Sequence, residues 1–419
     1  MPGSQTPQDW SGATVADIVD PSRPVTYGVV QPGPRQESGI PIIRGQDYSS
    51  GAVRTDGLYL VHRSIAAAYR RSSVVEGDLL LSIVGYVGLA AQVPASLAGA
   101  NLTQTTARIA VRGGFEARYF LHFFRGEDFR REVSRYTKGS AQPGLNLADV
   151  EKFRLVHPPL PEQRQIAAIL DTLDEAIRRT EQVIEKLKQI KQGLLHDLLT
   201  RGIDDNGELR VPPDEAPHLY KDSPLGRIPR GWEVELLDDV AIRGSGHTPS
   251  KSVPSYWNGG IKWVSLADSK RLDRVYIYET DKRISDLGIA NSSAVKHPAG
   301  TVILSRDAGV GKSAILASEM AVSQHFMAWH CGDRLYNLWL YYWLQYNKRR
   351  FESIAFGSTI QTIGLPFFKS LRVAVPRYVE QATMANTLTC VEKRAGEEAS
   401  QLAKLGTLKL GLMDDLLTG

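Results

Sequence analysis

Residues 158–173, P-P-L-P-E-Q-R-Q-I-A-A-I-L-D-T-L, begin a segment that occurs twice in the chain and reveals its architecture. Residues 158–200 align without a gap to residues 376–418, at a constant offset of 218 (376 minus 158). Identical pairs include Glu162/Glu380, Gln163/Gln381, Ala167/Ala385, Leu170/Leu388, Lys186/Lys404, Leu187/Leu405 and Lys191/Lys409. So many identities in one register indicate an internal duplication.

Both copies have the residue spacing of long helices. In the first copy, steps of three and four separate Ile166, Leu170, Leu173, Ile177, Thr180, Ile184, Leu187, Ile190, Leu194 and Leu198. In the second copy the same steps separate Met384, Leu388, Val391, Ala395, Leu402, Leu405, Leu408, Leu412 and Leu416, with Glu398 as a polar break. This pattern is typical of a coiled-coil seam, and each helix would be roughly 55–60 Å long. We predict that the two stripes pack against each other; two unrelated amphipathic helices, each on its own domain, are the alternative.

The blocks before the two helices also match, although more loosely. Residues 39–47 resemble residues 260–268, residues 77–82 resemble 300–305, and Gly139-Ser140 falls opposite Gly357-Ser358. Short β-branched runs with glycine turns, followed by an aromatic helix at residues 119–136 and 335–351, predict two mixed α/β domains of one fold. The Asp-, Gly- and Pro-rich residues 202–217 predict a solvated linker. The expected division is 1–158, first domain; 159–201, first helix; 202–219, linker; 220–376, second domain; 377–419, second helix.

Composition restricts the class of protein. The chain has 419 residues, 42% of them hydrophobic, and a net charge of +4. Residues 1–160 carry 17 basic and 14 acidic side chains, and residues 220–378 carry 21 and 14, so the basic excess lies in the two domains. This distribution favours two modules that face nucleic acid, although ordinary scatter explains it equally well. The two distant cysteines argue against a disulfide framework, and no signal peptide or membrane span is predicted, so we expect a cytoplasmic protein.

Specific motifs extend these observations to a family. The strings P-L-P-E-Q-R-Q-I-A-A-I-L-D (159–171), L-L-T-R-G-I-D (198–204), S-P-L-G-R-I-P-R-G-W-E-V (223–234) and L-S-R-D-A-G-V-G-K (304–312) resemble the specificity subunit of type I restriction-modification enzymes. The resemblance covers essentially the whole chain. It implies two DNA target-recognition domains and two antiparallel spacer helices, with Ile166, Leu170, Leu173, Leu187, Leu194, Leu388, Leu405 and Leu412 among the spacer residues.

The resemblance also implies partners and cofactors. It implies double-stranded DNA as the ligand, with each domain recognising one half of a split sequence. Two methyltransferase subunits would dock on the spacer helices, and restriction/translocase subunits would join through them. S-adenosylmethionine, ATP and Mg²⁺ are expected on those partners, with no cofactor, metal or catalytic residue in this chain. In the second spacer copy Val379 replaces Pro161, and Gly396 and Gly406 lower the helix propensity.

Three motifs suggest chemistry, and each is incomplete. R-D-A-G-V-G-K-S (306–313) resembles a phosphate-binding loop, but Arg306 replaces the first glycine and residues 314–317 fit a strand at least as well as the required helix. H-P-P-L (157–160) resembles the catalytic motif of adenine methyltransferases, but the amide and the aromatic residue are absent. His325, His330 and Cys331 have no fourth ligand at zinc spacing. A nucleotide-binding enzyme, or a coiled-coil scaffold that never contacts DNA, are the alternative functions.

Base recognition needs polar side chains at base edges and basic side chains at phosphates. In the first domain we predict DNA contacts for Arg44, Gln46, Tyr48, Arg70, Arg71, Tyr86, Lys138, Ser140 and Gln142. In the second we predict them for Tyr256, Trp257, Lys262, Lys270, Arg306, Lys312, Ser358 and Gln361. The alternative for each residue is an ordinary surface or turn position.

Overall fold

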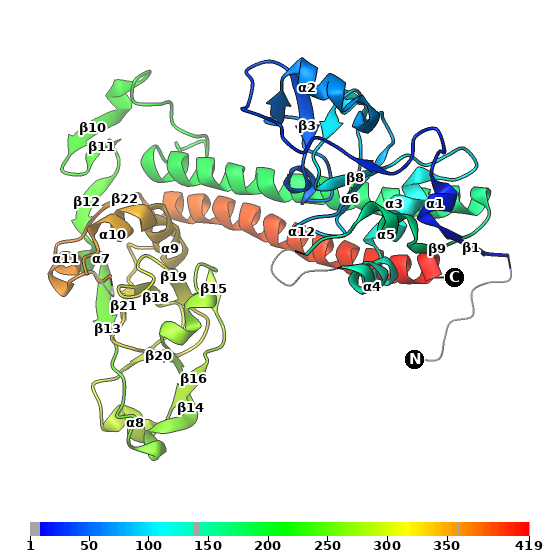
Figure 1. The fold of residues 1–419 in the computed structure, drawn as a ribbon. Helices are drawn as coiled ribbons and strands as arrows, with labels where there is room; N and C mark the ends of the chain where they lie inside the picture. Colours follow the sequence, from blue (N-terminus) through cyan, green and yellow to red (C-terminus); the bar gives the residue numbers. More distant parts are fainter. Residues whose placement is uncertain (1–8, 138–142, 358–360, 419) are drawn as a thin grey trace. The chain divides into compact units, whose positions relative to one another are not determined.

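A computed structural model describes residues 9–137, 143–357 and 361–418, and the chain divides into two compact units (Figure 1). The first unit consists of residues 1–181 with 400–419, and the second of residues 182–399. Helices α6 (Leu160–Thr200) and α12 (Tyr378–Thr418) each contribute one part to each unit. Each unit therefore contains one globular domain and one stretch of a helix pair.

The globular part of the first unit is a mixed α/β domain. A four-stranded sheet has the order β2-β8-β5-β6, a three-stranded sheet has the order β4-β3-β7, and β1 pairs with β9. The elements are β1 (Ser11–Thr14), α1 (Val15–Ile18), β2 (Thr26–Tyr27), β3 (Ile40–Ile43), β4 (Tyr59–Val61), α2 (Arg63–Ala68), β5 (Leu79–Ser82), β6 (Ala90–Gln92), β7 (Asn101–Leu102), β8 (Thr106–Ile109), α3 (Ala117–Arg125), α4 (Glu127–Tyr136), α5 (Leu147–Glu151) and β9 (Arg154–His157).

The globular part of the second unit repeats this topology with additions. Its sheets have the orders β13-β21-β18-β19-β15 and β16-β14-β20-β17, with the pairs β12-β22 and β10-β11. The elements are β10 (Tyr220–Ser223), β11 (Gly226–Pro229), β12 (Glu233–Leu236), α7 (Leu237–Val240), β13 (Ala241–Ser245), β14 (Trp257–Val264), β15 (Tyr276–Ile277), β16 (Lys282–Ile284), α8 (Asp286–Ala290), β17 (Lys296–His297), β18 (Val302–Ser305), β19 (Ser313–Leu316), β20 (Met320–Val322), β21 (Phe326–Cys331), α9 (Asn337–Tyr346), α10 (Lys348–Ile354), α11 (Leu365–Lys369) and β22 (Arg372–Val375).

Strand pairing confirms that the two domains share one fold. In the first, β3 pairs antiparallel with β4 and parallel with β7; in the second, β14 pairs antiparallel with β16 and parallel with β20. The pair β1-β9 corresponds to β12-β22, since Ser11 lies opposite His157 and Glu233 opposite Val375. Each predicted aromatic helix is in fact two helices. In the first domain the break between α3 and α4 falls at Gly126, whose backbone is extended.

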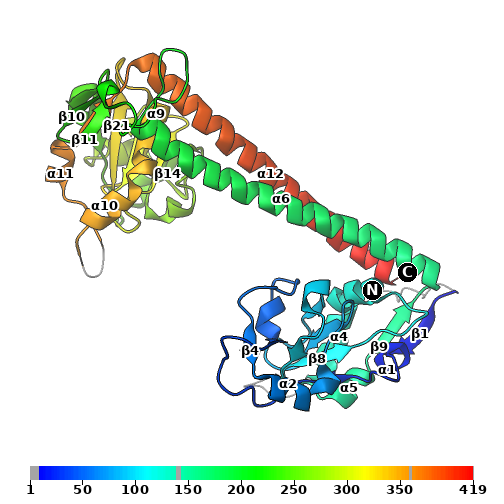
Figure 2. The same cartoon turned by 90° about the horizontal axis from the view of Figure 1, so that it is seen from above.

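The spacer helices run antiparallel within each unit (Figure 2). In the first unit Leu170 of α6 shares a hydrophobic cluster with Leu417 of α12. In the second, Leu199 of α6 shares a cluster with Leu388 of α12. α12 is continuous despite Gly396 and Gly406, because a long apolar face outweighs two unfavourable local propensities.

The predicted apolar seam is wrong at one equivalent position in each helix. Ile190 of α6 is 42% exposed and Leu408 of α12 is 51% exposed, so neither lies in the seam. At both positions the next residue, Lys191 or Lys409, turns toward the other helix instead, where its ammonium pairs with Glu392 or Asp174.

Two glutamines anchor the spacer helices to their domains in the same way. The Gln163 amide donates to the Pro158 carbonyl at 2.8 Å and accepts from the Glu116 amide at 2.9 Å. The Gln381 amide donates to the Pro376 carbonyl at 2.8 Å and accepts from the Tyr336 amide at 2.8 Å. Both glutamines are buried, so the matched Glu-Gln pair of the two copies has a structural role.

The segment after α6 is exposed or half-buried at most positions, in keeping with its polar composition, but it is held to the second unit where it begins. Ile203 is buried, and its backbone amide donates to the Glu380 carboxylate at 3.1 Å. The same carboxylate accepts from the Trp232 indole at 3.0 Å and pairs with the Arg210 guanidinium. This attachment has a physical reason: Glu380 is 7% exposed, and a buried carboxylate requires donors, which the chain after α6 supplies.

Candidate nucleic-acid interface

A groove of about 360 Å³ opens on the first domain between three turns. The turns follow β3, β5 and β7, and they bring together Arg44, Gln46 and Tyr86, three of the residues predicted from sequence to contact DNA. The complete lining is Val29, Val30, Pro32, Arg44, Gly45, Gln46, Val84, Gly85, Tyr86, Thr103, Gln104 and Thr105. Gln104, which was not among the predicted contact residues, faces the same groove and is exposed.

A buried aspartate holds the first of these turns in shape. Asp47 is 2% exposed and accepts from the Arg44 backbone amide at 2.9 Å and from the Arg44 guanidinium at 3.0 Å. Arg54 completes the arrangement with an ion pair of 2.6 Å. One buried carboxylate and two guanidiniums leave a net positive charge beside the groove, which suits a phosphate backbone.

Tyr86 is presented by a turn that requires glycine. Gly85 and Gly88 have φ angles of +76° and +88°, a region that side chains rarely adopt. The tight turn leaves the Tyr86 ring 58% exposed at its tip. An exposed aromatic ring beside two glutamine amides can stack on a base or sugar while the amides contact base edges.

One predicted contact residue of this region belongs to the core. Tyr48 is 1% exposed, and its hydroxyl lies 3.1 Å from the Thr106 hydroxyl. Burial raises the pKa of Tyr48 far above its ordinary value. The prediction of a DNA contact for Tyr48 is therefore wrong: the ring fills the space below the turn that carries Gln46.

The other predictions for the first domain remain untested. Arg70 and Arg71 are exposed but do not line the groove. Lys138, Ser140 and Gln142 lie outside the described residues, as does Ser358 of the second domain.

In the second domain, the turn that corresponds to the Tyr86 turn follows β18 and carries side chains of different chemistry. Asp307 accepts from the Thr362 hydroxyl and lies 2.7 Å from His325 Nδ1, while the Arg306 guanidinium lies 3.6 Å away. Gln361 is exposed, and its carbonyl accepts from the Ala308 amide at 3.3 Å. Arg306 and Gln361 are thus brought together, on a scaffold that carries an aspartate.

Several predicted contact residues of the second domain have intramolecular partners. The Lys312 ammonium donates to the Ser269 carbonyl at 3.1 Å and to its hydroxyl at 3.0 Å. The Lys262 ammonium donates to the Tyr278 carbonyl at 2.7 Å and pairs with Glu279 at 2.9 Å. The Trp257 indole donates to the Ser250 carbonyl at 3.0 Å. Lys270 is exposed and Tyr256 is half-buried.

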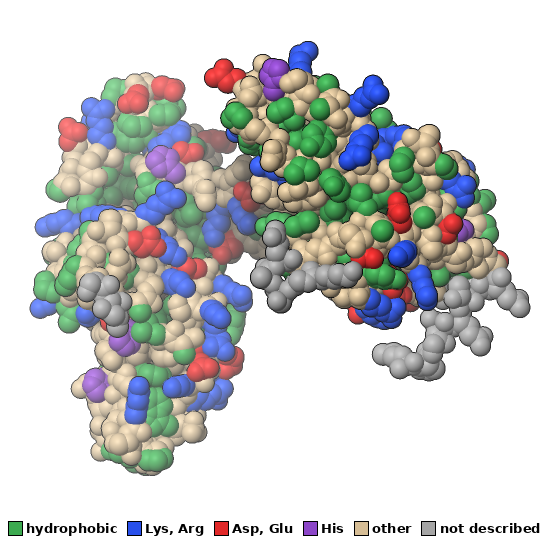
Figure 3. Space-filling view, in the orientation of Figure 1, with side chains coloured by type: hydrophobic (Ala, Val, Ile, Leu, Met, Phe, Trp, Pro, Cys, Tyr) green, Lys and Arg blue, Asp and Glu red, His purple; other side chains and the backbone are tan. Residues whose placement is uncertain are grey.

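The loop of residues 306–313 lacks the local structure of a phosphate-binding loop. The residues after Lys312 form strand β19, so the loop lacks the helix N-terminus that holds phosphates in a P-loop. Among the described residues, no group of three or more His, Cys, Asp or Glu side chains is placed to hold a metal ion. Within the same part of the chain, no helix is long and apolar enough to cross a membrane. In the view of Figure 3, basic side chains are dispersed over each unit.

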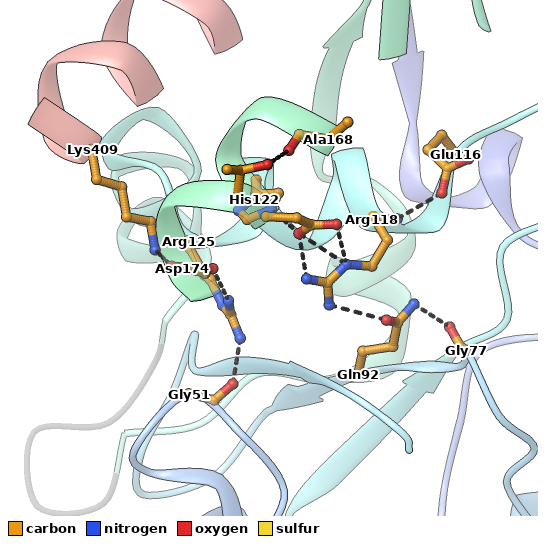
Figure 4. Close-up of polar contacts among 12 residues, drawn as sticks. Gly51, Gly77, Gln92, Glu116, Arg118, His122, Arg125, Ala168, Asp174 and Lys409 are labelled. Carbon is orange, nitrogen blue, oxygen red and sulfur yellow. Dashed lines mark hydrogen bonds and ion pairs between the residues drawn. The ribbon is translucent and has the colours of Figure 1, made fainter. Parts of the chain in front are cut away.

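A polar cluster joins the first domain to the spacer helices (Figure 4). Asp171 of α6 accepts from His122 of α3 at 2.8 Å and from the Arg118 guanidinium. Three residues along α6, Asp174 pairs with Lys409 of α12 and with Arg125 of α3. Burial alone would raise the pKa of Asp171, but the hydrogen bonds from His122 and Arg118 outweigh it and hold the pKa far below its ordinary value.

Part of this cluster recurs in the second unit. Lys191 lies 218 residues before Lys409 and pairs at 3.0 Å with Glu392, which lies 218 residues after Asp174. The duplication is therefore preserved at the level of individual ion pairs.

Comparisons with known proteins agree with this architecture. Residues 33–189 and 229–405 each match the family model described as type I restriction modification DNA specificity domain. The chain is 22% identical over 428 residues to a putative type I restriction enzyme MjaX specificity subunit of Methanocaldococcus jannaschii, covering 99% of this chain and 94% of that protein. It is 28% identical over 194 residues to the EcoBI specificity subunit of Escherichia coli, covering 45% of this chain and 41% of that protein.

Solved structures show the same fold. The S subunit of a type I restriction-modification system from M. genitalium matches with a TM-score of 0.58 at 12% identity, covering 100% of this chain and 98% of that one. A chain from a structure of complex assembly and conformational transition in a type I system matches with a TM-score of 0.56 at 16% identity, with both chains covered completely. Because the family model matches both halves of the duplicated chain, this protein belongs to the family of type I restriction-modification DNA specificity subunits.

Proposed function

We propose that the chain recognises a two-part DNA sequence, with one half-site for each domain, and that it carries the division 1–158, 159–201, 202–219, 220–376 and 377–419 predicted from its sequence. The observation that carries the proposal is a repeated scaffold with different side chains at the equivalent turns. The buried Asp47 and Asp268 hold the same turn, each accepting a backbone amide three residues earlier. Around these turns, Tyr86 and Gln104 lie in one domain and Asp307 and His325 in the other.

Recognition by two separate domains explains why one chain can be selective with modest contacts in each. The spacer ties both domains to one DNA molecule, so the second binding event occurs at a high effective concentration. The predicted contact residues other than Tyr48 remain candidates, with Arg44, Gln46, Tyr86 and Gln104 as the best supported group.

A domain exchange tests this proposal. Residues 220–376 would be replaced by the equivalent domain of a related specificity subunit, and the methylated sequences would be identified by methylation-sensitive sequencing in cells. We expect one half of the recognised sequence to change and the other to persist. Changes in both halves would mean that the two domains form a single recognition surface.

We propose further that methyltransferase subunits dock on the spacer helices, with restriction/translocase subunits joining through them. The equivalent residues Ile190 and Leu408 support this, because each exposes an apolar side chain on a helix face outside the seam. Docking at two equivalent places predicts two methyltransferases per chain. These partners would hold S-adenosylmethionine, ATP and Mg²⁺, and the site of action would be the cytoplasm, where the DNA is.

Charge substitutions test the docking sites. Ile190→Glu and Leu408→Glu should each lower the number of co-purified methyltransferase subunits from two to one, measured by native mass spectrometry. Leu287→Glu is the control, because Leu287 is also exposed but lies on α8 of the second domain. Two bound subunits in every variant would exclude these residues from the interface.

A further inference from the structure

In the polar cluster of Figure 4, a chain of polar contacts connects the spacer helices to Gly51, at the end of the turn that carries Gln46. Arg125 occupies its centre, on the last turn of α3, with a side chain that is 20% exposed. One guanidinium nitrogen lies 3.5 Å from the Asp174 carboxylate of α6. Another donates to the Gly51 carbonyl, and Nε donates to the Ala90 carbonyl of β6 at 3.3 Å.

Gly51 lies just after the turn that carries Arg44 and Gln46. The Gly51 amide donates to the Tyr48 carbonyl at 2.9 Å, which closes the turn that begins at Arg44. Gln46, inside this turn, is exposed and lines the groove. A rigid, planar guanidinium that donates in several directions therefore links a spacer carboxylate to the backbone beneath a groove residue.

A second route from α6 reaches a different part of the domain. The Arg118 guanidinium donates to Asp171 and, at 3.1 Å, to the Gln92 side-chain oxygen. Gln92 in turn donates to the Gly77 carbonyl at 3.2 Å. None of these residues lines the groove, so Arg118 shares the spacer contact of Arg125 but not its contact with the recognition turn.

In the second unit, the residue equivalent to Arg125 does not pair with the spacer carboxylate. Gln345 is the equivalent of Arg125, since each lies nine residues after the residue, Tyr336 or Glu116, whose amide donates to the matched glutamine. The Gln345 side-chain amide donates to Asp273 at 2.9 Å and to the Ser313 hydroxyl at 2.8 Å. The spacer carboxylate Glu392 is bound instead by Lys191 and by the Tyr342 hydroxyl at 3.1 Å. Among the described residues, no hydrogen bond or ion pair joins Gln345 to Glu392.

From this geometry we propose that Arg125 is a specificity-determining positioning residue, which holds the Gln46 turn at a fixed place relative to the spacer and so sets base discrimination in the first half-site. The proposal rests on the proposed DNA recognition. The proposal predicts an effect on the first half-site alone, because the described residues of the second unit do not link the spacer carboxylate to Gln345.

The test is selection of bound DNA from a duplex library with 30 random base pairs, by the full-length chain co-expressed with its methyltransferase. For Arg125→Met we expect discrimination between bases in the first half-site to fall about tenfold, with the second half-site unchanged. Arg125→Lys keeps the charge beside Asp174 but loses the forked contacts, so it should show the same one-sided loss. Arg118→Met and Gln345→Met are controls, and both should retain the wild-type preference in the first half-site.

The outcomes separate this inference from the proposed function. If the wild-type chain selects no sequence, the proposed function fails. If it selects two half-sites and both Arg125 variants keep full discrimination in the first, only the positioning role fails. Equal losses in both half-sites, or the same loss in Arg118→Met, would also overturn it, because they would indicate a general weakening of the fold. Thermal unfolding of each variant shows whether a loss of binding reflects an unfolded first domain. If Arg125→Met is unfolded, the base discrimination of Arg125→Lys in the first half-site tests the positioning role.

Discussion

The Glu380 carboxylate offers a quantitative test of how the second unit is closed. Three donor groups converge on it: the Ile203 amide, the Trp232 indole and the Arg210 guanidinium. Glu380 is 7% exposed and the Arg210 side chain 13% exposed, so Glu380→Ala leaves a largely buried cation without its partner. Removing one partner of a buried ion pair costs about 3–5 kcal/mol. For a unit of this size that corresponds to a Tm lower by about 6–20 °C.

The duplication supplies a matched control. Glu162 is the equivalent residue of the first unit, and none of the described residues donates a hydrogen bond to its carboxylate. Glu162→Ala should therefore change stability by no more than about 0.5 kcal/mol. Glu380→Gln should lie between the two, because an amide oxygen still accepts from the indole but does not neutralise Arg210.

Urea unfolding followed by circular dichroism measures these differences, and an unchanged slope with denaturant shows that the variants unfold from comparable states. Equal losses of stability in Glu380→Ala and Glu162→Ala would show that the buried ion pair does not stabilise the second unit. A Glu380→Gln variant as stable as the wild type would show that the buried charge contributes nothing.

Three further predictions concern packing, pH and thiol reactivity. Leu170→Ala and Leu388→Ala, equivalent residues with no exposed surface, should each cost about 2–5 kcal/mol in urea unfolding, and a cost below 1 kcal/mol would contradict the packing at that position. Burial lowers the pKa of His122, against the hydrogen bond to a carboxylate that raises it, so the unfolded chain takes up a proton first and stability should fall as the pH drops below about 6.5. His122→Gln should lose less stability than the wild type between pH 7 and pH 5, and identical pH profiles would show that the histidine does not titrate in this way. Burial raises the pKa of the Cys331 thiol to about 12, whereas Cys390 is exposed, so a maleimide at pH 7.5 should label Cys390 rapidly and Cys331 slowly; equal rates would show that Cys331 is accessible.

The duplication, the two long helices and the mixed α/β character of both domains could be predicted from the amino-acid sequence. These features depend on local and periodic properties, namely residue spacing, glycine turns and strings repeated in one register. The matched Gln163 and Gln381 show that the repeat predicts individual contacts as well, because these identical residues make the same hydrogen bonds in both units. The incomplete phosphate-loop motif was also interpreted correctly from local pattern, since a strand follows it.

Which polar side chains face a groove and which are enclosed could not be predicted without the folded structure. Tyr48 and Gln46 are two residues apart, yet the Tyr48 ring lies in the core and the Gln46 side chain lines the groove. Arg125, Asp174 and Lys409 come from three helices and meet only after folding. Burial and ion pairing depend on neighbours that are distant in the chain. Composition did not reveal, for the same reason, that the segment after α6 is anchored at Ile203, whose backbone binds a buried carboxylate 177 residues further along the chain.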